Sequence, residues 1–324
     1  MRIAIVRLSA LGDIVQTMIV VQFIKNKFPD SQIDWFVDEK FKDVLKNTEG
    51  LSNIFGLDIN KIKRDKSLRS LLNLFFFIRN KGNYDIALDF QGLIKSALIT
   101  RFIKSKKRCG FDKNSLRERL ASYFYNYKVN ISYSENVIFR YVELVNKSLN
   151  LKITKSKIDN KKAFYKYKKT KRTIKKVILV IGASFDSKIY PIGNYKEIFE
   201  NLDAEFIAIW KTKKEKEMAV MLARENKKIS ISSQLSLVDL VDLIAKSDLV
   251  IGGDTGPTHL AWALNIPSII LFGPTSANRN TFQTDINIAL SSSSHVNPYK
   301  INKKDYSIGA INPKKIIKAA KKIL

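Results

Sequence analysis

The stretch that decides the fold is Arg2–Val37, with the sequence RIAIVRLSALGDIVQTMIVVQFIKNKFPDSQIDWFV. Arg2–Leu8 is mostly apolar and short, which predicts a buried strand. Ile14–Phe28 has the length and composition of a helix that ends before Pro29, and Gln32–Val37 alternates as a second strand does. A strand, a helix and a second strand in this order are typical of a doubly wound α/β sheet.

The remainder of the first half continues this alternation. Further strands are predicted at Leu51–Leu57, Asp85–Phe90 and Arg108–Phe111, and helices at 67–80, 92–104 and Asn136–Leu149. We therefore expect residues 1–165 to form one α/β domain.

A polar, lysine-rich run over Lys161–Lys176 precedes a second series of strands and helices, so we place the domain boundary there. The predicted strands are Val177–Ile181, Glu205–Trp210, Lys228–Ile231, Asp248–Ile251 and Ser268–Phe272, and the predicted helices are 194–201, 213–225, 236–246 and 257–264. Residues 166–324 are expected to form the second domain. Its last helix, Pro313–Leu324, begins with proline at a favourable position and can pack back on the first domain.

Composition limits the functional classes without choosing among them. The chain has 324 residues, of which 45% are apolar, so two cores of ordinary size are possible. A net charge of +27 favours a polyanionic partner: nucleic acid, an anionic membrane or a phosphorylated substrate. A lysine-rich compositional habit explains much of the excess equally well. The single cysteine, Cys109, excludes an internal disulfide framework and indicates a reducing compartment, with the cytoplasm as the expected location.

Membrane insertion and secretion are not expected. The longest apolar stretches are shorter than the roughly 20 residues that a spanning helix needs. Met1–Leu8 lacks the layout of a secretory signal.

Two turns that contain glycine and an acidic residue occupy matching places in the two halves. Ser9–Asp13 follows the first strand, and Gly252–His259 follows a late strand of the second half. Ligands of open α/β sheets bind beyond the carboxyl ends of the strands, so each turn would place a carboxylate beside a ligand. The pair predicts a cleft enzyme that transfers a group between two bound substrates.

The second turn has the features of an anion site. Gly252 and Gly253 allow a ligand to approach the backbone, and a helix that begins near Thr255 offers N–H groups and its dipole to a diphosphate. Asp254 can orient His259, which lies in the first helical turn. The alternative is an ordinary capped helix with an exposed histidine.

Two charged residues have open interpretations at this stage. Lys188 follows the first strand of the second half, where it can neutralise a leaving diphosphate beside Ser184, or it is one surface lysine among many. Asp13 is either a helix N-cap or a general base directed at an attacking hydroxyl. A dehydrogenase is disfavoured because neither half contains the glycine trio of a dinucleotide site.

Several blocks in a fixed order resemble the bacterial family 9 glycosyltransferases. In the first half they are Arg7–Asp13, Asp89–Ser96, Gly110–Asp112 and Arg117–Ser122; in the second half they are Asp254–Gly256 with His259, and Phe272–Thr275. The resemblance covers nearly the whole chain.

This resemblance implies a GT-B architecture: two Rossmann-like doubly wound domains that face a cleft, the first binding the acceptor and the second the nucleotide sugar. It implies inverting heptosyl transfer from ADP-L-glycero-β-D-manno-heptose to the inner Kdo sugar of Kdo-lipid A, in lipopolysaccharide inner-core synthesis. By the same resemblance Asp13 is the catalytic base. The implied donor-binding residues are Ser184, Lys188, Glu215, Asp254, Thr255, Gly256 and His259, with Lys188 also counted as catalytic.

The acceptor side is expected to hold polar and basic residues that bind its sugar, phosphates and carboxylates. The expected set is Ser9, Gly12, Lys61, Lys63, Arg64, Gln91, Arg117, Arg119 and Arg140. No cofactor and no metal are expected, since the chain has no Asp-x-Asp triplet. Such an enzyme would work in the cytoplasm, peripherally on the inner membrane.

Four points remain open. A family 9 enzyme with a different donor or acceptor is the nearest alternative. The details of donor affinity are also open, because Gly182–Phe185 stands where relatives tend to carry a threonine pair and Pro257 follows the donor glycine. A nucleic-acid-binding protein is the alternative from another class, but it is disfavoured because no helix-turn-helix, zinc spacing or aromatic RNA-binding signature is present. The apolar, basic-flanked stretch Leu68–Ile78 either lies at a bilayer interface or covers the sheet.

Overall fold

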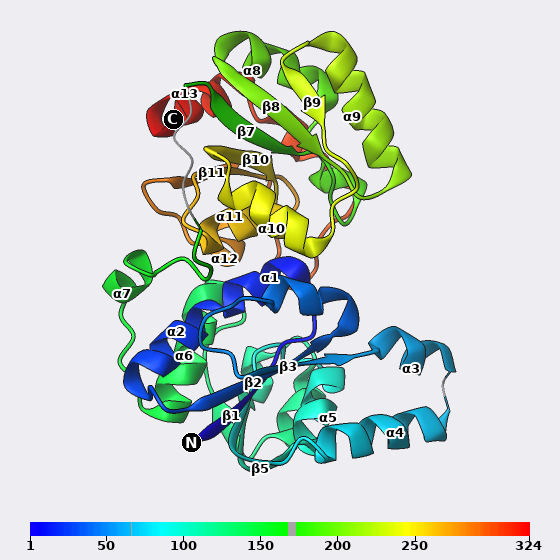
Figure 1. Ribbon diagram of the computed structural model, residues 1–324, viewed down its shortest axis with the longest axis vertical. Helices are drawn as coiled ribbons and strands as arrows, with labels where there is room; N and C mark the ends of the chain where they lie inside the picture. The colour runs from blue at the N-terminus through cyan, green and yellow to red at the C-terminus, as the bar shows by residue number, and fades with distance from the viewer. Residues whose placement is uncertain (66, 168–172) are drawn as a thin grey trace. The chain divides into compact units, whose positions relative to one another are not determined.

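The computed structural model describes residues 1–65, 67–167 and 173–324, and the side chains of Ile62 and Lys63 are outside that description. The chain divides into two compact units, Met1–Tyr165 and Lys166–Leu324. Within the described residues each unit contains a parallel six-stranded sheet flanked by helices (Figure 1). Parallel sheets need such helices, because the strands are buried on both faces.

The first sheet has the strand order β3-β2-β1-β4-β5-β6. Its strands are β1 (Arg2–Val6), β2 (Gln32–Asp38), β3 (Asn53–Leu57), β4 (Asn83–Asp89), β5 (Lys104–Phe111) and β6 (Tyr127–Val129). The chain winds outward from β1 in one direction and from β4 in the other, so the order reverses between these two neighbours. That reversal marks the place where an open α/β sheet binds its ligand.

Helices cover both faces of this sheet. They are α1 (Leu11–Thr17), α2 (Ile19–Lys27), α3 (Ile59–Asp65), α4 (Leu68–Arg79), α5 (Ile94–Phe102), α6 (Val137–Leu149) and α7 (Lys155–Asp159). Ala4 and Val6 pack in one core with residues of α4 and α5. Ile3 and Ile5 are fully buried too and point to the opposite face, as alternation along a strand requires.

The single helix predicted over Ile14–Phe28 is instead two helices, α1 and α2, that meet at Met18. The Thr17 hydroxyl donates to the Asp13 carbonyl at 2.7 Å, and such bonds to the preceding turn bend helices. The prediction of one continuous helix was therefore wrong, although both pieces have a buried apolar face.

The second sheet has the order β12-β11-β10-β7-β8-β9, which repeats the arrangement of the first. Its strands are β7 (Lys175–Val180), β8 (Ala204–Ile209), β9 (Ile229–Ile231), β10 (Leu249–Gly253), β11 (Ser268–Phe272) and β12 (Asn287–Ser291). Its helices are α8 (Tyr195–Asn201), α9 (Lys213–Glu225), α10 (Leu237–Ala245), α11 (Gly256–Ala263), α12 (Ala277–Asn280) and α13 (Pro313–Ile323). Here the order reverses between β10 and β7.

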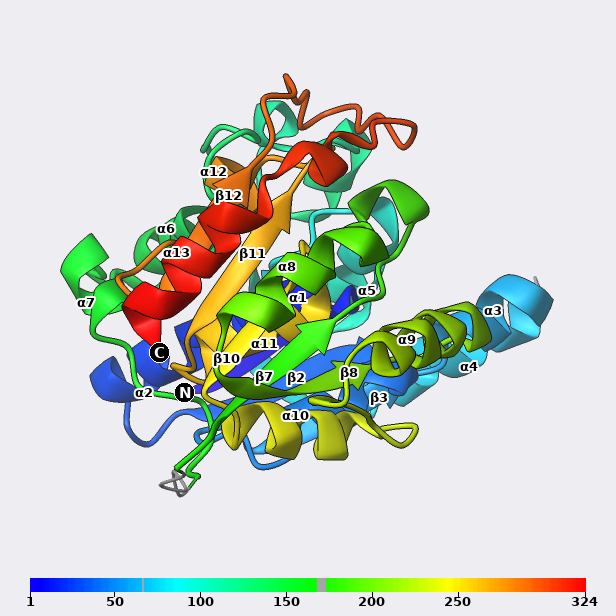
Figure 2. The same cartoon turned by 90° about the horizontal axis from the view of Figure 1, so that it is seen from above.

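The C-terminal helix α13 packs within its own unit, on α8 and over β11 and β12 (Figure 2). Ile316, Ile317 and Ala320 on its inner face belong to the core of the second unit. Asn312 caps its start by accepting a hydrogen bond from the Lys314 N–H, and Pro313 follows in the first turn.

The edge strands β6 and β12 were not predicted, and β5 begins earlier than the predicted Arg108. In the described part of the chain β6 pairs only with Cys109–Phe111, so the lysine-rich start of β5 lies at a sheet edge. Edges tolerate charged residues that the interior of a sheet does not, and the apolar pattern that marks buried strands is missing there.

Candidate active site

The reversal point of the first sheet brings together three of the predicted residues. Asp13 lies in the first turn of α1, just after β1, and Gln91 follows the end of β4. Gln91 Oε1 accepts a hydrogen bond from the Leu8 N–H at 2.9 Å, and Gln91 Nε2 donates to the Ser9 hydroxyl at 3.4 Å. Ser9, Asp13 and Gln91 therefore lie together at the carboxyl edge of the neighbouring strands β1 and β4.

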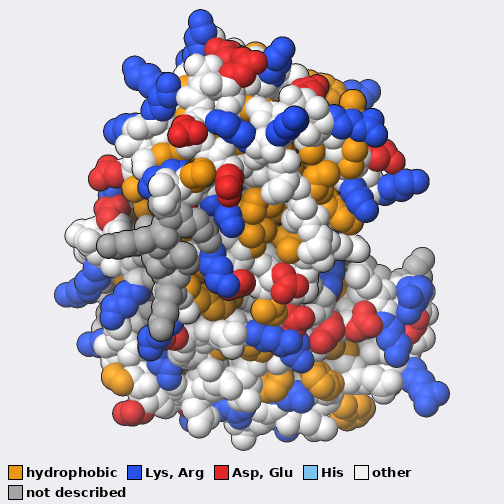
Figure 3. Space-filling view, turned by 45° about the horizontal axis from the view of Figure 1, so that its top comes forward, with side chains coloured by type: hydrophobic (Ala, Val, Ile, Leu, Met, Phe, Trp, Pro, Cys, Tyr) orange, Lys and Arg blue, Asp and Glu red, His pale blue; other side chains and the backbone are white. Residues whose placement is uncertain are grey.

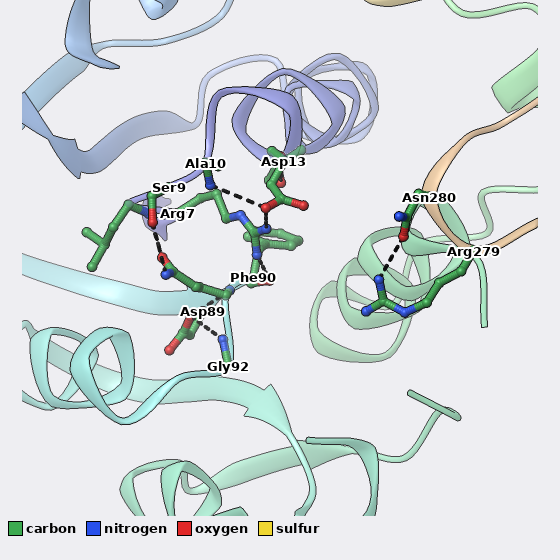
Figure 4. A network of polar contacts seen from close by, with 12 residues as sticks. Arg7, Ser9, Ala10, Asp13, Asp89, Phe90, Gly92, Arg279 and Asn280 are labelled. Atoms are coloured by element: carbon green, nitrogen blue, oxygen red, sulfur yellow. Dashed lines mark hydrogen bonds and ion pairs between the residues drawn. The ribbon is translucent and has the colours of Figure 1, made fainter. Parts of the chain in front are cut away.

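Asp13 is held by a buried arginine (Figure 4). Arg7, 6% exposed, places one guanidinium nitrogen 2.7 Å from Asp13 Oδ2 and donates from the other to the Phe90 carbonyl at 2.7 Å. The Ala10 N–H donates to the same Oδ2 at 3.2 Å. Burial alone would lower the pKa of Arg7, but the Asp13 carboxylate outweighs it and raises that pKa. The Asp13 side chain stays 40% exposed, so it is oriented and still accessible.

A buried carboxyl shapes the loop that carries Gln91. Asp89 Oδ1 accepts from the N–H groups of Gln91 at 2.8 Å and Gly92 at 3.1 Å, and Tyr125 donates its hydroxyl to Oδ2 at 2.7 Å. Burial raises the pKa of Asp89, and these donors oppose the rise. Gly92 has a φ of +66°, and a Cβ there would come within 2.4 Å of Leu116 Cδ2, so glycine is required.

The basic residues predicted for acceptor binding have different environments. Lys61 and Arg64 lie on α3, which follows β3 in the chain, and Arg117 and Arg119 lie in the segment that follows β5. All four are exposed. The side chain of Lys63 lies outside the described residues.

Arg140 is a correction to the predicted acceptor set. Its guanidinium is buried and donates to the backbone carbonyls of Ile131, Ser132 and Ser115, at 3.0, 2.5 and 2.8 Å. It also lies 4.5 Å from the centre of the Phe111 ring. These contacts occupy the planar fork that would otherwise grip a phosphate, so Arg140 has a structural role in holding this loop.

In the second unit the two loops at the sheet's reversal point are joined by an ion pair. Lys188, in the segment after β7, places its Nζ 3.0 Å from Asp254 Oδ2, immediately after β10. His259 Nε2 lies 2.8 Å from Asp254 Oδ1, and Asn280 Nδ2 donates to Oδ2 at 3.0 Å. The side chains of Lys188, Asp254 and His259 are each no more than 11% exposed. The loops approach so closely that a Cβ on Gly253 would come within 2.4 Å of the Lys188 carbonyl oxygen.

The charge state of this cluster follows from its contacts. Burial opposes ionisation of Asp254, but the adjacent Lys188 ammonium and the hydrogen bond from His259 outweigh it and hold the pKa of Asp254 well below its usual range. Asp254 is thus a fixed anion that positions Lys188 and the imidazole.

The start of α11 is organised by a residue that was not predicted. The Thr258 hydroxyl accepts from the Thr255 N–H at 3.2 Å and donates to the Gly253 carbonyl at 2.7 Å. The Thr255 N–H, expected to face an anion, is therefore already engaged in the loop. Gly256 opens the helix beside it, and Pro257 follows without an N–H.

Glu215 and Ser184 complete the predicted donor set. Glu215 caps α9 by accepting from the N–H groups of Lys211 at 2.6 Å and Thr212 at 3.1 Å. Its carboxyl also packs against Gly182, where a Cβ would come within 2.3 Å of it. This contact places Glu215 beside the loop after β7 that carries Ser184, whose side chain is exposed.

Sequence reasoning missed Arg7, Asp89, Thr258 and Asn280 as parts of the two sites. Arg7 and Asp89 are charged residues next to or at the end of an apolar strand. Charged residues are rarely buried unless they are paired, so this position could have indicated a paired, functional side chain. Asn280 is a small polar residue after β11 with no pattern that marks it.

The structure adds three observations that bear on metal, polyanion and membrane binding. Within residues 1–65, 67–167 and 173–324, no group of three or more His, Cys, Asp or Glu side chains is arranged to hold a metal ion. Lysine and arginine side chains are spread over the face seen in Figure 3 and are not gathered in one stripe. None of the helices described is long and apolar enough to cross a bilayer.

Comparison with known proteins supplies the family. The model of glycosyltransferase family 9 (heptosyltransferase) matches residues 78–307. The chain is 40% identical to lipopolysaccharide heptosyltransferase 1 of Campylobacter coli over 344 aligned positions, which cover 100% of this chain and 99% of the relative. Lipopolysaccharide heptosyltransferase 1 of Pseudomonas aeruginosa is 27% identical over 85% of this chain and 79% of its own length.

A solved structure is similar over the full length. The structure of Escherichia coli heptosyltransferase WaaC with ADP matches with a TM-score of 0.83 at 22% identity and covers 100% of both chains. This likeness confirms the predicted GT-B fold. The chain is a glycosyltransferase and belongs to family 9, the heptosyltransferase family.

Proposed function

We propose that this chain transfers L-glycero-D-manno-heptose from ADP-heptose to the inner Kdo sugar of Kdo-lipid A. The observation that carries the proposal is the 40% identity, over the whole of both chains, to a lipopolysaccharide heptosyltransferase 1. Two polar sites at the reversal points of two parallel sheets support it, because a transferase needs one site for each substrate.

On the acceptor side, Asp13 is the proposed general base. Arg7 and the Ala10 N–H both contact Oδ2, and we assign the other oxygen, Oδ1, to the acceptor hydroxyl. As the hydroxyl oxygen bonds to the anomeric carbon, its proton passes to Asp13. The bond between that carbon and the diphosphate oxygen breaks with its electron pair, ADP leaves from the opposite face, and the configuration inverts.

On the donor side, the leaving diphosphate gains negative charge, so a fixed cation and a helix N-terminus favour the transition state. Lys188 is the proposed cation, and Asp254 is the residue that positions it. Gly256 and Thr255 lie at the start of α11, and His259 is held beside them by Asp254. Ser184 and Glu215 are proposed to contact the remainder of the nucleotide sugar.

The acceptor is proposed to bind at the carboxyl edge of the first sheet. Ser9, Gly12 and Gln91 lie at the reversal point, and Lys61, Lys63, Arg64, Arg117 and Arg119 are the basic residues proposed to meet its phosphates and carboxylates. Because lipid A is a membrane lipid, this assignment places the enzyme peripherally on the cytoplasmic face of the inner membrane.

An acceptor-competition assay tests the proposal. Purified protein receives ADP-heptose with equal amounts of Kdo-lipid A and of the same acceptor already carrying one heptose. We expect the first acceptor to be consumed. Preferential consumption of the second would instead identify the activity of a heptosyltransferase II.

Charge reversal at Arg117 and Arg119 provides a second test. It should weaken acceptor binding and leave ADP-heptose affinity unchanged, since the two substrates are assigned to different units. Equal loss of both affinities would contradict the assignment.

A further inference from the structure

Helix α4 has apolar side chains on nearly every side. Packing against the first unit accounts for only those on its inner side. Ile78 is buried, and Leu74 packs against the core of the first unit. Phe75 meets Phe102 of α5 edge-on, with ring centres 5.1 Å apart. This inner side attaches α4 to the protein and accounts for the helix as a cover of the sheet.

The outer side of α4 is also apolar and faces solvent. Leu68, Leu72 and Phe76 follow one another at intervals of four residues and are 72%, 45% and 57% exposed. Residues four apart lie above one another on a helix, so they form one stripe. Phe77, 40% exposed, extends the stripe around the helix. We call Leu68, Leu72, Phe76 and Phe77 the α4 stripe.

Such a stripe differs from the other exposed apolar residues of the chain. Those residues, such as Met221 of α9, are spread over many elements, which is normal for protein surfaces. Several large apolar side chains on one helix instead form a contiguous patch, and contiguous patches mark interaction sites.

The sequence around the α4 stripe is strongly basic. Residues 59–81, which include α3 and α4, contain seven Lys or Arg and one Asp. Arg69 is exposed on the outer side of α4, and Lys81 extends over the Phe77 ring, 4.0 Å from its centre. In Figure 2 α3 and α4 project from one end of the first unit, so this surface is presented at an extremity of that unit.

We propose that the α4 stripe is a docking surface for an anionic phospholipid bilayer. An amphipathic helix with a basic margin lies in the plane of the interface, places its apolar side chains among the acyl chains and meets the lipid phosphates with its cations. The stripe and the charge distribution carry this inference independently of the reaction assigned to the chain.

Charge complementarity selects the bilayer over a second copy of the chain. A dimer through the α4 stripe would bring two segments of the same strong positive charge together, and like charges at close range repel. A negatively charged lipid surface offers both the apolar layer and the counter-charge.

Vesicle sedimentation tests the proposal with donor and acceptor both absent. Full-length protein is spun with vesicles of phosphatidylcholine alone and with vesicles that contain phosphatidylglycerol. We expect binding to the anionic vesicles that falls about tenfold or more in the Leu72→Ser/Phe76→Ser variant. Arg69→Gln should lower it about fivefold, since each basic residue near the surface contributes about 1 kcal/mol.

Met221→Ser is the matched control, because it removes an exposed apolar side chain from a helix of the second unit. It should bind vesicles like the wild type. Equal binding by Leu72→Ser/Phe76→Ser and the wild type would overturn the proposal. Concentration-dependent dimerisation that this double variant abolishes, with no vesicle binding, would also overturn it and assign the stripe to self-association.

A fluorescent label locates the contact directly. Cys109 is buried and burial raises the pKa of its thiol to about 11, so it resists labelling. An environment-sensitive dye at Leu68→Cys should shift to the blue when anionic vesicles are added, and the same dye at Met221→Cys should not. Equal shifts at both positions, or none at Leu68→Cys while the protein binds, would contradict docking through α4. Transfer activity is measured separately, so failure here is distinguishable from failure of the proposed reaction.

Discussion

Replacing Asp254 with alanine would remove the anion that organises the second site. The carboxylate has three polar partners: Lys188 at 3.0 Å, His259 at 2.8 Å and Asn280 at 3.0 Å. Lys188 would remain as a cation with only 11% of its side chain exposed. A buried charge without its partner is strongly destabilising, because the cost of removing it from water is no longer offset.

The magnitude follows from this environment. Removing one partner of a buried ion pair costs about 3–5 kcal/mol of unfolding free energy. For a unit of this size each kcal/mol corresponds to about 2–4 °C, so the melting temperature of the second unit should fall by roughly 6–20 °C. Asp242→Ala is the control: it breaks a 2.7 Å pair with Lys246 in which both side chains are about half exposed, and it should change stability by about 0.5 kcal/mol or less.

The loss should depend on pH in a defined direction. The pKa of Asp254 is lower in the folded protein than the unfolded value of about 3.9. Its contribution is therefore complete above that unfolded value and is lost as the pH falls below about 4. The difference between the wild type and Asp254→Ala should be constant from about pH 5 to 7 and should shrink at lower pH.

Denaturant unfolding of both variants at pH 7 and pH 3, followed by circular dichroism, measures these differences. Asp254→Ala as stable at pH 7 as Asp242→Ala would refute the reasoning. So would a difference from the wild type that grows as the pH is lowered.

Three further predictions concern the reaction and the first unit. Asp13→Asn should lower turnover about a hundredfold or more without changing ADP affinity measured by calorimetry, and near-normal turnover would remove the proposed base. Arg140→Met should lower the unfolding free energy by about 2–4 kcal/mol, because it leaves the buried Ser115 carbonyl and the part-buried carbonyls of Ile131 and Ser132 without their donor, whereas unchanged denaturation with weaker acceptor binding would return Arg140 to the acceptor set. Activity should persist in excess chelator, and a loss that magnesium or manganese reverses would contradict the metal-independent mechanism.

Much of the fold was predictable because the central strands are buried on both faces. Strands such as β7 and β11 are short apolar runs between turn signals, and such runs are distinctive. Of the four edge strands that the structure describes, β3 and β9 were predicted and β6 and β12 were missed, because an edge position requires a weaker apolar pattern than a central one. The division between α1 and α2 depends on a hydroxyl of Thr17 that bonds to the preceding turn, which composition does not reveal.

The sequence indicated individual candidate residues better than it indicated the contacts between them. Asp254 and His259 belong to one strand-to-helix turn, since Asp254 precedes the N-cap of α11 and His259 lies near the start of that helix, so their proximity could be expected from the sequence. The pair between Lys188 and Asp254 depends on which strands are neighbours, and strand order cannot be obtained from local sequence. Arg140 was wrongly assigned because the sequence does not show whether an arginine is exposed to solvent or buried against backbone carbonyls.

Mass spectrometry of the reaction product tests the central claim most directly. Purified protein is incubated with ADP-heptose and Kdo-lipid A, and the lipid is weighed before and after. The account predicts that the acceptor gains the mass of one heptose residue while ADP is released. An unchanged acceptor, in the presence of folded protein that binds ADP-heptose, would contradict it.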